Sequence, residues 1–169
     1  MENKMRGIKL EKVVLNIGTG EGGSKLNNAV KLLEKITGRQ PSRRQCKVKI
    51  VKWDIRPGLE IGAMVTLRNA QAEEMFQKAL NAVNHTMRER SVSDNGNLSI
   101  GIKEYIDLPG INYDPEIGIF GMDMSCKFKR AGERISRRKK QKRKVPAHQK
   151  ITKEEARKFL AEKYNVKFE

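Results

Sequence analysis

Alternating apolar and polar residues mark several strands along the chain. Between Lys9 and Ile17 the apolar residues Val13, Leu15 and Ile17 alternate with a more polar set. This period of two predicts a strand with one buried face, so that Asn16 points away from the core. The same alternation predicts strands at 46–53, 63–68, 98–102 and 120–128. The buried positions predicted on these four are Cys46, Val48, Ile50, Ala63, Val65, Leu67, Leu98, Ile100, Ile102, Phe120, Met122, Met124, Cys126 and Phe128.

Apolar residues at helical spacing predict three helices. The first follows a glycine-rich loop, with Ser24 as its cap and Gly38 at its end. The second is broken by an Asp-Asn-Gly turn, and the third opens at Thr152, whose spacing to Glu155 is that of a capping box. The inward positions predicted are Leu26, Ala29, Val30, Leu33, Ile36, Ala72, Met75, Phe76, Ala79, Leu80, Val83, Ala156, Phe159, Leu160 and Tyr164.

The order of these elements, βαββαββα, predicts an α+β fold of the split-βαβ kind. Its sheet is mainly antiparallel with helices packed on one face, because the connection around 54–62 is too short for a parallel crossover. The length of 169 residues fits a single domain, 1–169, with a long basic insertion at about 130–150. The second face of such a sheet is open to a partner. Its predicted residues are Asn16, Lys47, Lys49, Thr66 and Arg68.

Positive charge is concentrated in two segments. The chain has 36 Lys and Arg against 20 Asp and Glu, a net charge of +16, and residues 39–52 and 127–150 account for this excess. Such a charge distribution is typical of nucleic-acid-binding proteins. Every charged residue from Arg134 to Pro146 is basic, which predicts a run that stays extended and mobile until an anion neutralises it. The basic run comprises Arg134, Arg137, Arg138, Lys139, Lys140, Lys142, Arg143 and Lys144.

The sequence offers little support for an enzyme. The segment Gly18–Gly23 matches G-x-G-x-x-G between a strand and a helix, but no acidic residue follows at the distance a dinucleotide site needs. Ser24 and Lys25 also stand in the reverse of the Walker order. The loop is therefore interpreted as a tight turn or a place of close RNA approach. The carboxylates between Asp107 and Asp123 are interpreted as turn formers, and no nucleophile–base set is evident.

Metal, cofactor and membrane signals are weak as well. Cys46 and Cys126 lie 80 residues apart and only His85 and His148 accompany them, so two buried reduced thiols are expected in place of a zinc site. No apolar stretch has the length of a signal peptide or a membrane helix. We expect a soluble, cytoplasmic protein without metal or cofactor.

Basic residues interleaved with bulky ones at 43–53 predict a fixed surface in place of a disordered tail. A fixed surface recognises the shape of double-stranded RNA through phosphate and 2′-hydroxyl contacts, for which Asn, Gln and Thr are suitable. Two functions stay open at this point. One is a reader of a specific RNA, and the other is a general RNA-binding module or chaperone that acts through the basic run.

Four stretches resemble a known family. They are "KVVLNIGTGE", "LLEKITGRQP", "IRPGLEIGAMVTLR" and, most specifically, "LPGINYDPEIGIFGMDM". The chain resembles, from about Lys9 to Phe168, the uL5 family of 5S rRNA-binding proteins of the large ribosomal subunit, in its archaeal or eukaryotic type and more closely the archaeal one. The basic run resembles an insertion of these types.

The resemblance implies a non-enzymatic structural protein that anchors 5S rRNA in the central protuberance and contacts P-site tRNA. It implies Asn16, Gln40 and Thr66 as 5S rRNA ligands, and an offset of one residue would put Arg39 in place of Gln40. With the basic residues of the open face, the expected 5S rRNA contacts are Asn16, Arg39, Gln40, Arg43, Arg44, Lys47, Lys49, Thr66 and Arg68. The expected tRNA contacts are Arg56, Pro57 and Gly58. Further implied partners are 23S-type rRNA and the neighbouring proteins uL18 and uS13.

Overall fold

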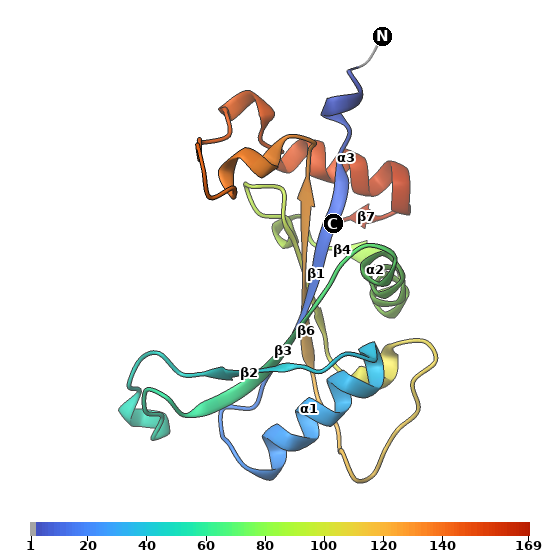
Figure 1. Cartoon of the computed structure of the whole chain (residues 1–169). Helices are drawn as coiled ribbons and strands as arrows, with labels where there is room; N and C mark the ends of the chain where they lie inside the picture. The colour runs from blue at the N-terminus through green and yellow to red at the C-terminus, as the bar shows by residue number, and fades with distance from the viewer. Residues whose placement is uncertain (1–2) are drawn as a thin grey trace. The chain divides into compact units, whose positions relative to one another are not determined.

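The structure, a computed structural model, describes residues 3–169 and has three helices and seven strands in that range (Figure 1). The predicted order βαββαββα is present, with two short strands added. The helices are α1 (Ser24–Thr37), α2 (Ala70–Ala82) and α3 (Lys153–Tyr164). The strands are β1 (Lys9–Gly18), β2 (Ser42–Gln45), β3 (Glu60–Leu67), β4 (Thr86–Met87), β5 (Leu98–Ile102), β6 (Met122–Lys129) and β7 (Lys167–Phe168).

Five strands form one mainly antiparallel sheet in the order β2-β3-β1-β6-β5, which confirms the α+β class. The short strands β4 and β7 pair in parallel. The chain divides into two compact units. Unit 1 combines the N-terminal segment up to Val13 with Arg68–Ser99 and Ser125–Glu169, and unit 2 combines Val14–Leu67 with Ile100–Met124. Whether residues 1–169 act as a single domain stays a prediction.

In unit 2, helix α1 packs on strand β3. The alternating residues Ala63, Val65 and Leu67 are buried as predicted, and they meet the apolar side of α1 at Leu26, Ala29, Leu32 and Leu33. The helix ends as predicted at Gly38, whose left-handed conformation (φ 64°) lets its N–H bond to the carbonyl of Glu34. The prediction of Ser24 as the cap is wrong. Ser24 is the first helical residue, and Gly23 (φ 84°) occupies the cap position.

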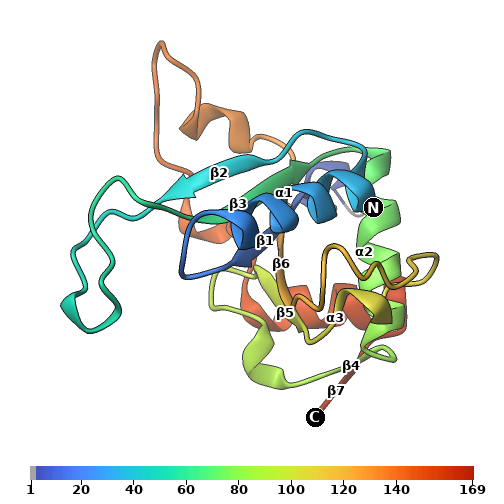
Figure 2. The ribbon, with the colours of Figure 1, turned by 90° about the horizontal axis from the view of Figure 1, so that it is seen from below.

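The strand predicted at 46–53 is wrong in its position. The strand that pairs with β3 lies earlier, at Ser42–Gln45, and the following residues form a long arm ending in a short 3₁₀ turn at Val51–Trp53. The predicted antiparallel hairpin itself is confirmed. Ile50 and Ile55 exchange two backbone hydrogen bonds of 2.9 and 3.1 Å, so the arm is a hairpin with a four-residue tip (Figure 2).

Unit 1 is held by an aromatic cluster. Phe76 of α2 makes edge contacts with Phe128 of β6 and with Tyr164 of α3, at centroid distances of 6.2 and 4.8 Å. Phe159 of α3 packs against both partners. The capping box at the start of α3 is confirmed, because Thr152 and Glu155 bond to each other's backbone N–H groups.

None of the helices among residues 3–169 has the length and apolar composition needed to cross a membrane.

Gly62 on β3 is a position where a side chain does not fit. A Cβ there would lie 2.9 Å from the carbonyl oxygen of Ile17, a backbone atom of the neighbouring strand. We expect Gly62→Ala to lower the free energy of unfolding by about 1–3 kcal/mol in urea titrations, because neither strand can move without losing ladder hydrogen bonds. Gly101→Ala is the control, since its Cβ would meet only the Asp123 carboxylate at 3.8 Å. Equal effects of the two substitutions would contradict this prediction.

Candidate nucleic-acid interface

Asn16 and Thr66 lie on neighbouring strands of unit 2. Asn16 alternates with buried Leu15 and Ile17 on β1, and Thr66 alternates with buried Val65 and Leu67 on β3. Both side chains are half-buried, and neither makes a side-chain hydrogen bond within the described residues. The period of two thus places an amide and a hydroxyl on the sheet face turned away from the core, where their polar atoms are available to a ligand.

The basic residues of β2 and of the connection before it are exposed, but Arg43 does not lie on this face. It is paired with buried Ala63 of β3 and bonds to Asn27 of α1, so it lies on the helix side of the sheet, which corrects its grouping with the open face. Arg43 of β2 forms an ion pair of 2.9 Å with Glu60 and donates a second hydrogen bond of 2.9 Å to the amide oxygen of Asn27. Arg44 lies over the sulfur of Met64 at 3.6 Å. Arg39 and Gln40 are exposed in the connection between α1 and β2. Arg39 and Gln40 are thus exposed donors before β2, whereas Arg43 on β2 is neutralised within the chain.

The arm between β2 and β3 carries five of the predicted contacts. Lys47 and Lys49 lie on the arm and not on a sheet strand, which corrects the prediction that they belong to the open face of the sheet. The base of the arm is closed by backbone hydrogen bonds from Cys46 to Leu59 (2.8 Å) and from Gly58 to Cys46 (3.0 Å). Gly58 has φ +90°, a conformation suited to glycine. Arg56 lies 3.7 Å from Asp54, and both are exposed.

Exposed apolar residues at the tip of the arm were missed by the sequence analysis. Trp53 is 66% exposed and Val51 is 79% exposed, although the alternation had predicted a half-buried strand here. Asp54 next to Trp53 adopts a left-handed conformation (φ 48°) that turns the chain at the tip. The polar pair Lys52 and Asp54 on either side of Trp53, followed by Pro57-Gly58, is the sequence signal that could have indicated an exposed tip.

The basic run is anchored at its beginning. Residues Glu133–Ser136 form a 3₁₀ turn, after which the Arg137 guanidinium pairs with Glu11 of β1 (2.8 Å between Nη2 and Oε2) and with Glu133 (3.0 Å). Glu11 is buried and also lies 3.3 Å from Lys127. The hydrogen bond from Arg137, aided by Lys127, lowers the pKa of Glu11 to about 2. One cation of the run is thus neutralised within the chain.

The rest of the run projects outward from unit 1 (Figure 2). Arg138 donates to the carbonyl of Gln141 at 2.9 Å, and Arg143 N–H bonds to the carbonyl of Ile135, so residues 135–143 form a turn and not the fully extended segment that was predicted. The charged residues from Arg138 to Lys144 are all exposed. Arg134 is exposed as well, and Arg68 is exposed directly after β3.

The motifs of the enzyme interpretations have structural roles. In the glycine loop, the Thr19 hydroxyl donates to the carbonyls of Glu21 and Ile61, and the Glu21 carboxylate pairs with Lys25 at 2.8 Å. Asp114 pairs with Lys35 at 2.8 Å and accepts the N–H of Glu116, and the hydrogen bond from Lys35 lowers its pKa. These carboxylates close turns and neutralise lysines.

The two cysteines differ in environment. Cys126 is buried as predicted, and burial raises the pKa of its thiol. Cys46 is only half-buried, which corrects the prediction of two buried thiols. The reason is that Cys46 lies on the arm, after the end of β2, where no core covers it. Among residues 3–169 no group of three or more His, Cys, Asp or Glu side chains is placed to hold a metal ion.

Comparison with known proteins gives a consistent result over nearly the whole chain. Residues 3–56 match the family model described as "Ribosomal protein L5", and residues 60–168 match the model for the C-terminus of the same ribosomal protein family. The chain is 45% identical to the large ribosomal subunit protein uL5 of Sulfurisphaera tokodaii, over 97% of this chain and 93% of the relative. It is 47% identical to uL5 of Pyrobaculum aerophilum, over 92% and 87%, and 42% identical to uL5 of Nanoarchaeum equitans, over 98% of both.

The matched segments include β1, most of the arm, the basic run and α3, and only residues 57–59 at the base of the arm lie between them. The relatives are named as proteins of the large ribosomal subunit, and in this chain the glycine loop and Asp114 have structural roles. Together these matches show that the chain belongs to the ribosomal protein L5 (uL5) family, and is a structural constituent of the large subunit of the cytoplasmic ribosome.

Proposed function

We propose that the chain binds 5S rRNA through the open face of β1 and β3, anchors it in the central protuberance, and contacts P-site tRNA with the tip of its arm. As a protein of the large subunit it associates with ribosomal RNA. The proposal adds which RNA is bound and by which residues. The observation that carries it is the pair Asn16 and Thr66, two unsatisfied polar side chains on adjacent strands that face away from the core.

The chemistry of this face suits a folded RNA. An amide and a hydroxyl offer donors and acceptors to 2′-hydroxyl groups and base edges, while cations alone recognise phosphate without regard to sequence. Arg39, Gln40 and Arg44 add exposed donors beside them, and Lys47 and Lys49 extend the basic surface onto the arm. Arg43 is assigned a smaller share, because Glu60 already neutralises it. Arg68 stays in the proposed contact set on account of its exposure.

Replacing Asn16 and Thr66 by alanine tests the 5S rRNA contact. We expect the double variant to bind 5S rRNA about 10–100-fold more weakly, since each of the two lost hydrogen bonds costs about 0.5–1.5 kcal/mol. Affinity for an unrelated RNA of equal length should not change, and neither should the slope of log affinity against log salt. The matched control is the double variant Ser24→Ala with Asn112→Ala. Ser24 is an exposed residue of α1, which packs on the other face of β3, and Asn112 is an exposed loop residue. An equal loss for both RNAs would favour a general RNA-binding module.

The tip of the arm supports the proposed tRNA contact. Trp53 and Val51 give it an exposed apolar surface, and Lys52 and Arg56 add positive charge beside it. Aromatic rings stack on bases or riboses, and cations pair with phosphate, so a tip with both is suited to an RNA partner. Pro57 and Gly58 shape the return of the chain behind the tip.

Trp53→Ala tests the tip separately from the sheet face. In ribosomes that carry the variant, we expect tRNA to leave the peptidyl site about fivefold faster or more, because one stacking contact is worth at least about 1 kcal/mol. Trp53→Phe keeps an aromatic ring for stacking, so tRNA should leave at a rate close to that of the wild type. Affinity of the free protein for 5S rRNA should stay unchanged in both variants. If Trp53→Ala releases tRNA at the wild-type rate, the tip does not contact tRNA.

The neighbours uL18, uS13 and 23S-type rRNA remain proposals of the same kind. The basic run, from Arg134 to Lys144, is proposed to bind rRNA or tRNA phosphates, with Arg137 as its anchor to the fold in place of an RNA contact.

A further inference from the structure

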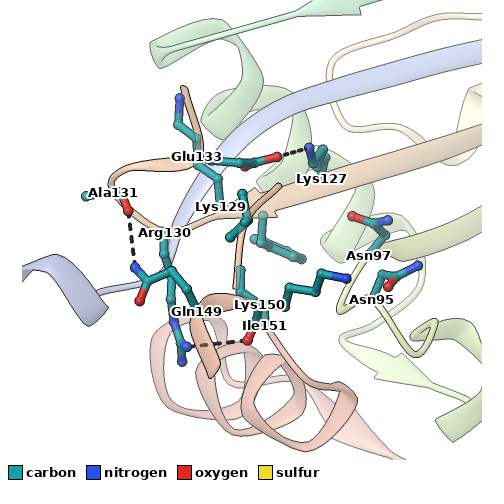
Figure 3. A pocket seen from close by; sticks show the side chains of 12 residues that line it. Asn95, Asn97, Lys127, Lys129, Arg130, Ala131, Glu133, Gln149, Lys150 and Ile151 are labelled. Atoms are coloured by element: carbon teal, nitrogen blue, oxygen red, sulfur yellow. Dashed lines mark hydrogen bonds and ion pairs between the residues drawn. The ribbon is translucent and has the colours of Figure 1, made fainter. Parts of the chain in front are cut away.

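A pocket of about 290 Å³ lies in unit 1, where the basic run leaves and rejoins the fold (Figure 3). Glu133, before the run, and Val145, after it, both line this pocket. Three segments form its walls: residues 127–133 at the end of β6, the turn at 95–97, and residues 149–151 before α3. None of the proposed 5S rRNA or tRNA contacts lines it, so the pocket is a separate site.

The wall from β6 contains a buried cation that is only partly satisfied. Arg130 is 8% exposed, and its guanidinium bonds to Glu155 (2.8 Å) and to the carbonyl of Lys150 (3.4 Å). Its Nε is buried and has no hydrogen-bond partner among the described residues. Buried polar groups nearly always have a partner, so an unsatisfied one beside a cavity points to a ligand or water. Lys129 and Lys150 add two cations that have no acidic partner within 3–169.

The opposite wall presents two side-chain amides on a tight turn. Asn95 and Asn97 flank Gly96, whose φ of +71° and missing Cβ let the turn lie directly on Ile151, since a Cβ there would come within 2.7 Å of Ile151 Cγ2. Backbone hydrogen bonds between Ser93 and Asn97 (2.8 Å) and between Gly96 and Ser93 (2.9 Å) fix the turn. Neither side-chain amide has a hydrogen-bond partner among the described residues, and in Figure 3 the Lys150 side chain extends toward them.

We propose that this pocket binds one unstacked nucleotide of single-stranded RNA, with its phosphate on Lys129 and Lys150 and its base edge on Asn95 and Asn97. Side-chain amides both donate and accept, as base edges require, and lysines bind phosphate as point charges. Phe128 and Ile151 supply apolar surface for the base. The volume lies at the lower end of ligand pockets, which suits one nucleotide and excludes a helix. The inference rests on the proposed RNA binding by the basic run, which would bring RNA to this opening.

The test measures binding of a fluorescent single-stranded RNA hexamer to the full chain. Two variants alter the pocket in different ways: Asn95→Ala with Asn97→Ala removes the amides, and Ala131→Phe fills the space at an exposed position without removing a charge. We expect each to weaken hexamer binding about tenfold, a loss equivalent to one or two hydrogen bonds, with an unchanged salt slope. Asn112→Ala should bind as the wild type does, and all variants should unfold at the wild-type temperature.

Three results would overturn the proposal. The first is unchanged hexamer binding in both pocket variants, and the second is an affinity for inorganic phosphate equal to that for the hexamer. The third is displacement of the hexamer by a free nucleoside monophosphate at equal concentration, which would assign the pocket to free nucleotides. The 5S rRNA affinity of the same proteins is measured in parallel. Selectivity for 5S rRNA that survives in the pocket variants separates a failure of this inference from a failure of the proposed function.

Discussion

Glu11→Gln is expected to lower the free energy of unfolding by about 3 kcal/mol at pH 7. The wild-type carboxylate is 8% exposed and neutralises Arg137 and Lys127. The neutral amide leaves these two partly exposed cations next to each other with Glu133 as their remaining carboxylate partner. Removing one partner of a buried ion pair is strongly destabilising for this reason. The magnitude follows from the pKa of Glu11, which lies at about 2 in the folded chain against its usual 4.5.

The same shift fixes the pH dependence. A carboxyl group whose pKa is lowered on folding stabilises the fold fully when the pH is above its pKa in the unfolded chain. This stability is lost as the pH falls from about 4.5 toward about 2. The difference between wild type and Glu11→Gln should therefore be largest at neutral pH and shrink over this acid range. Urea titrations at several pH values measure it. Glu74→Gln, in an exposed pair with Lys78, is the control and should cost less than about 1 kcal/mol. A Glu11→Gln effect no larger than this would contradict the buried network.

Neutralising the exposed cations of the basic run should have the largest effect on RNA affinity. Seven residues are replaced by glutamine: Arg134, Arg138, Lys139, Lys140, Lys142, Arg143 and Lys144. If each contacts one phosphate, the slope of log affinity against log salt falls by about 5–6, at about 0.7–0.9 for each contact. The wild type would then lose about 10³-fold more affinity than the variant between about 50 and 200 mM salt. Binding titrations with ribosomal RNA across a salt series measure this slope.

Arg137→Gln provides the matched control for the run. Its guanidinium already lies on Glu11 and Glu133, so this substitution should lower stability and change the salt slope by less than one contact. If the slope falls for Arg137→Gln by one seventh of its fall in the sevenfold variant, then Arg137 leaves Glu11 and binds phosphate when RNA binds. An unchanged slope in the sevenfold variant would exclude the run from RNA binding.

Periodicity predicted most of the fold because the core of each element is regular. The alternation at Val13, Leu15 and Ile17 and the helical spacing through Phe76 correspond to buried faces in the structure. The same rule failed at 46–53, because Cys46, Val48 and Ile50 follow a strand-like alternation but no second layer covers the arm there, and Val48 is 66% exposed. An apolar pattern predicts burial only where another element is available to pack against it.

For the candidate site, local pattern correctly predicted which face of its strand a residue occupies, while the RNA contacts themselves stay a prediction. Asn16 and Thr66 lie on adjacent strands and face away from the core, as their alternation predicted. The anchoring of Arg137 could not be predicted, since its partner Glu11 is 126 residues away and only the fold brings them together. The pocket beside the run depends in the same way on the packing of Gly96 against Ile151, which no local pattern reveals.

The central claim is that a folded face, and not positive charge alone, selects 5S rRNA. The most direct measurement is the affinity of the full chain for 5S rRNA and for an unrelated RNA of equal length, followed to high salt, where phosphate contacts contribute least. We predict a preference of at least about 100-fold for 5S rRNA that persists at high salt and in the sevenfold glutamine variant. Parallel loss of both affinities with rising salt would contradict the claim and leave a charge-driven RNA binder.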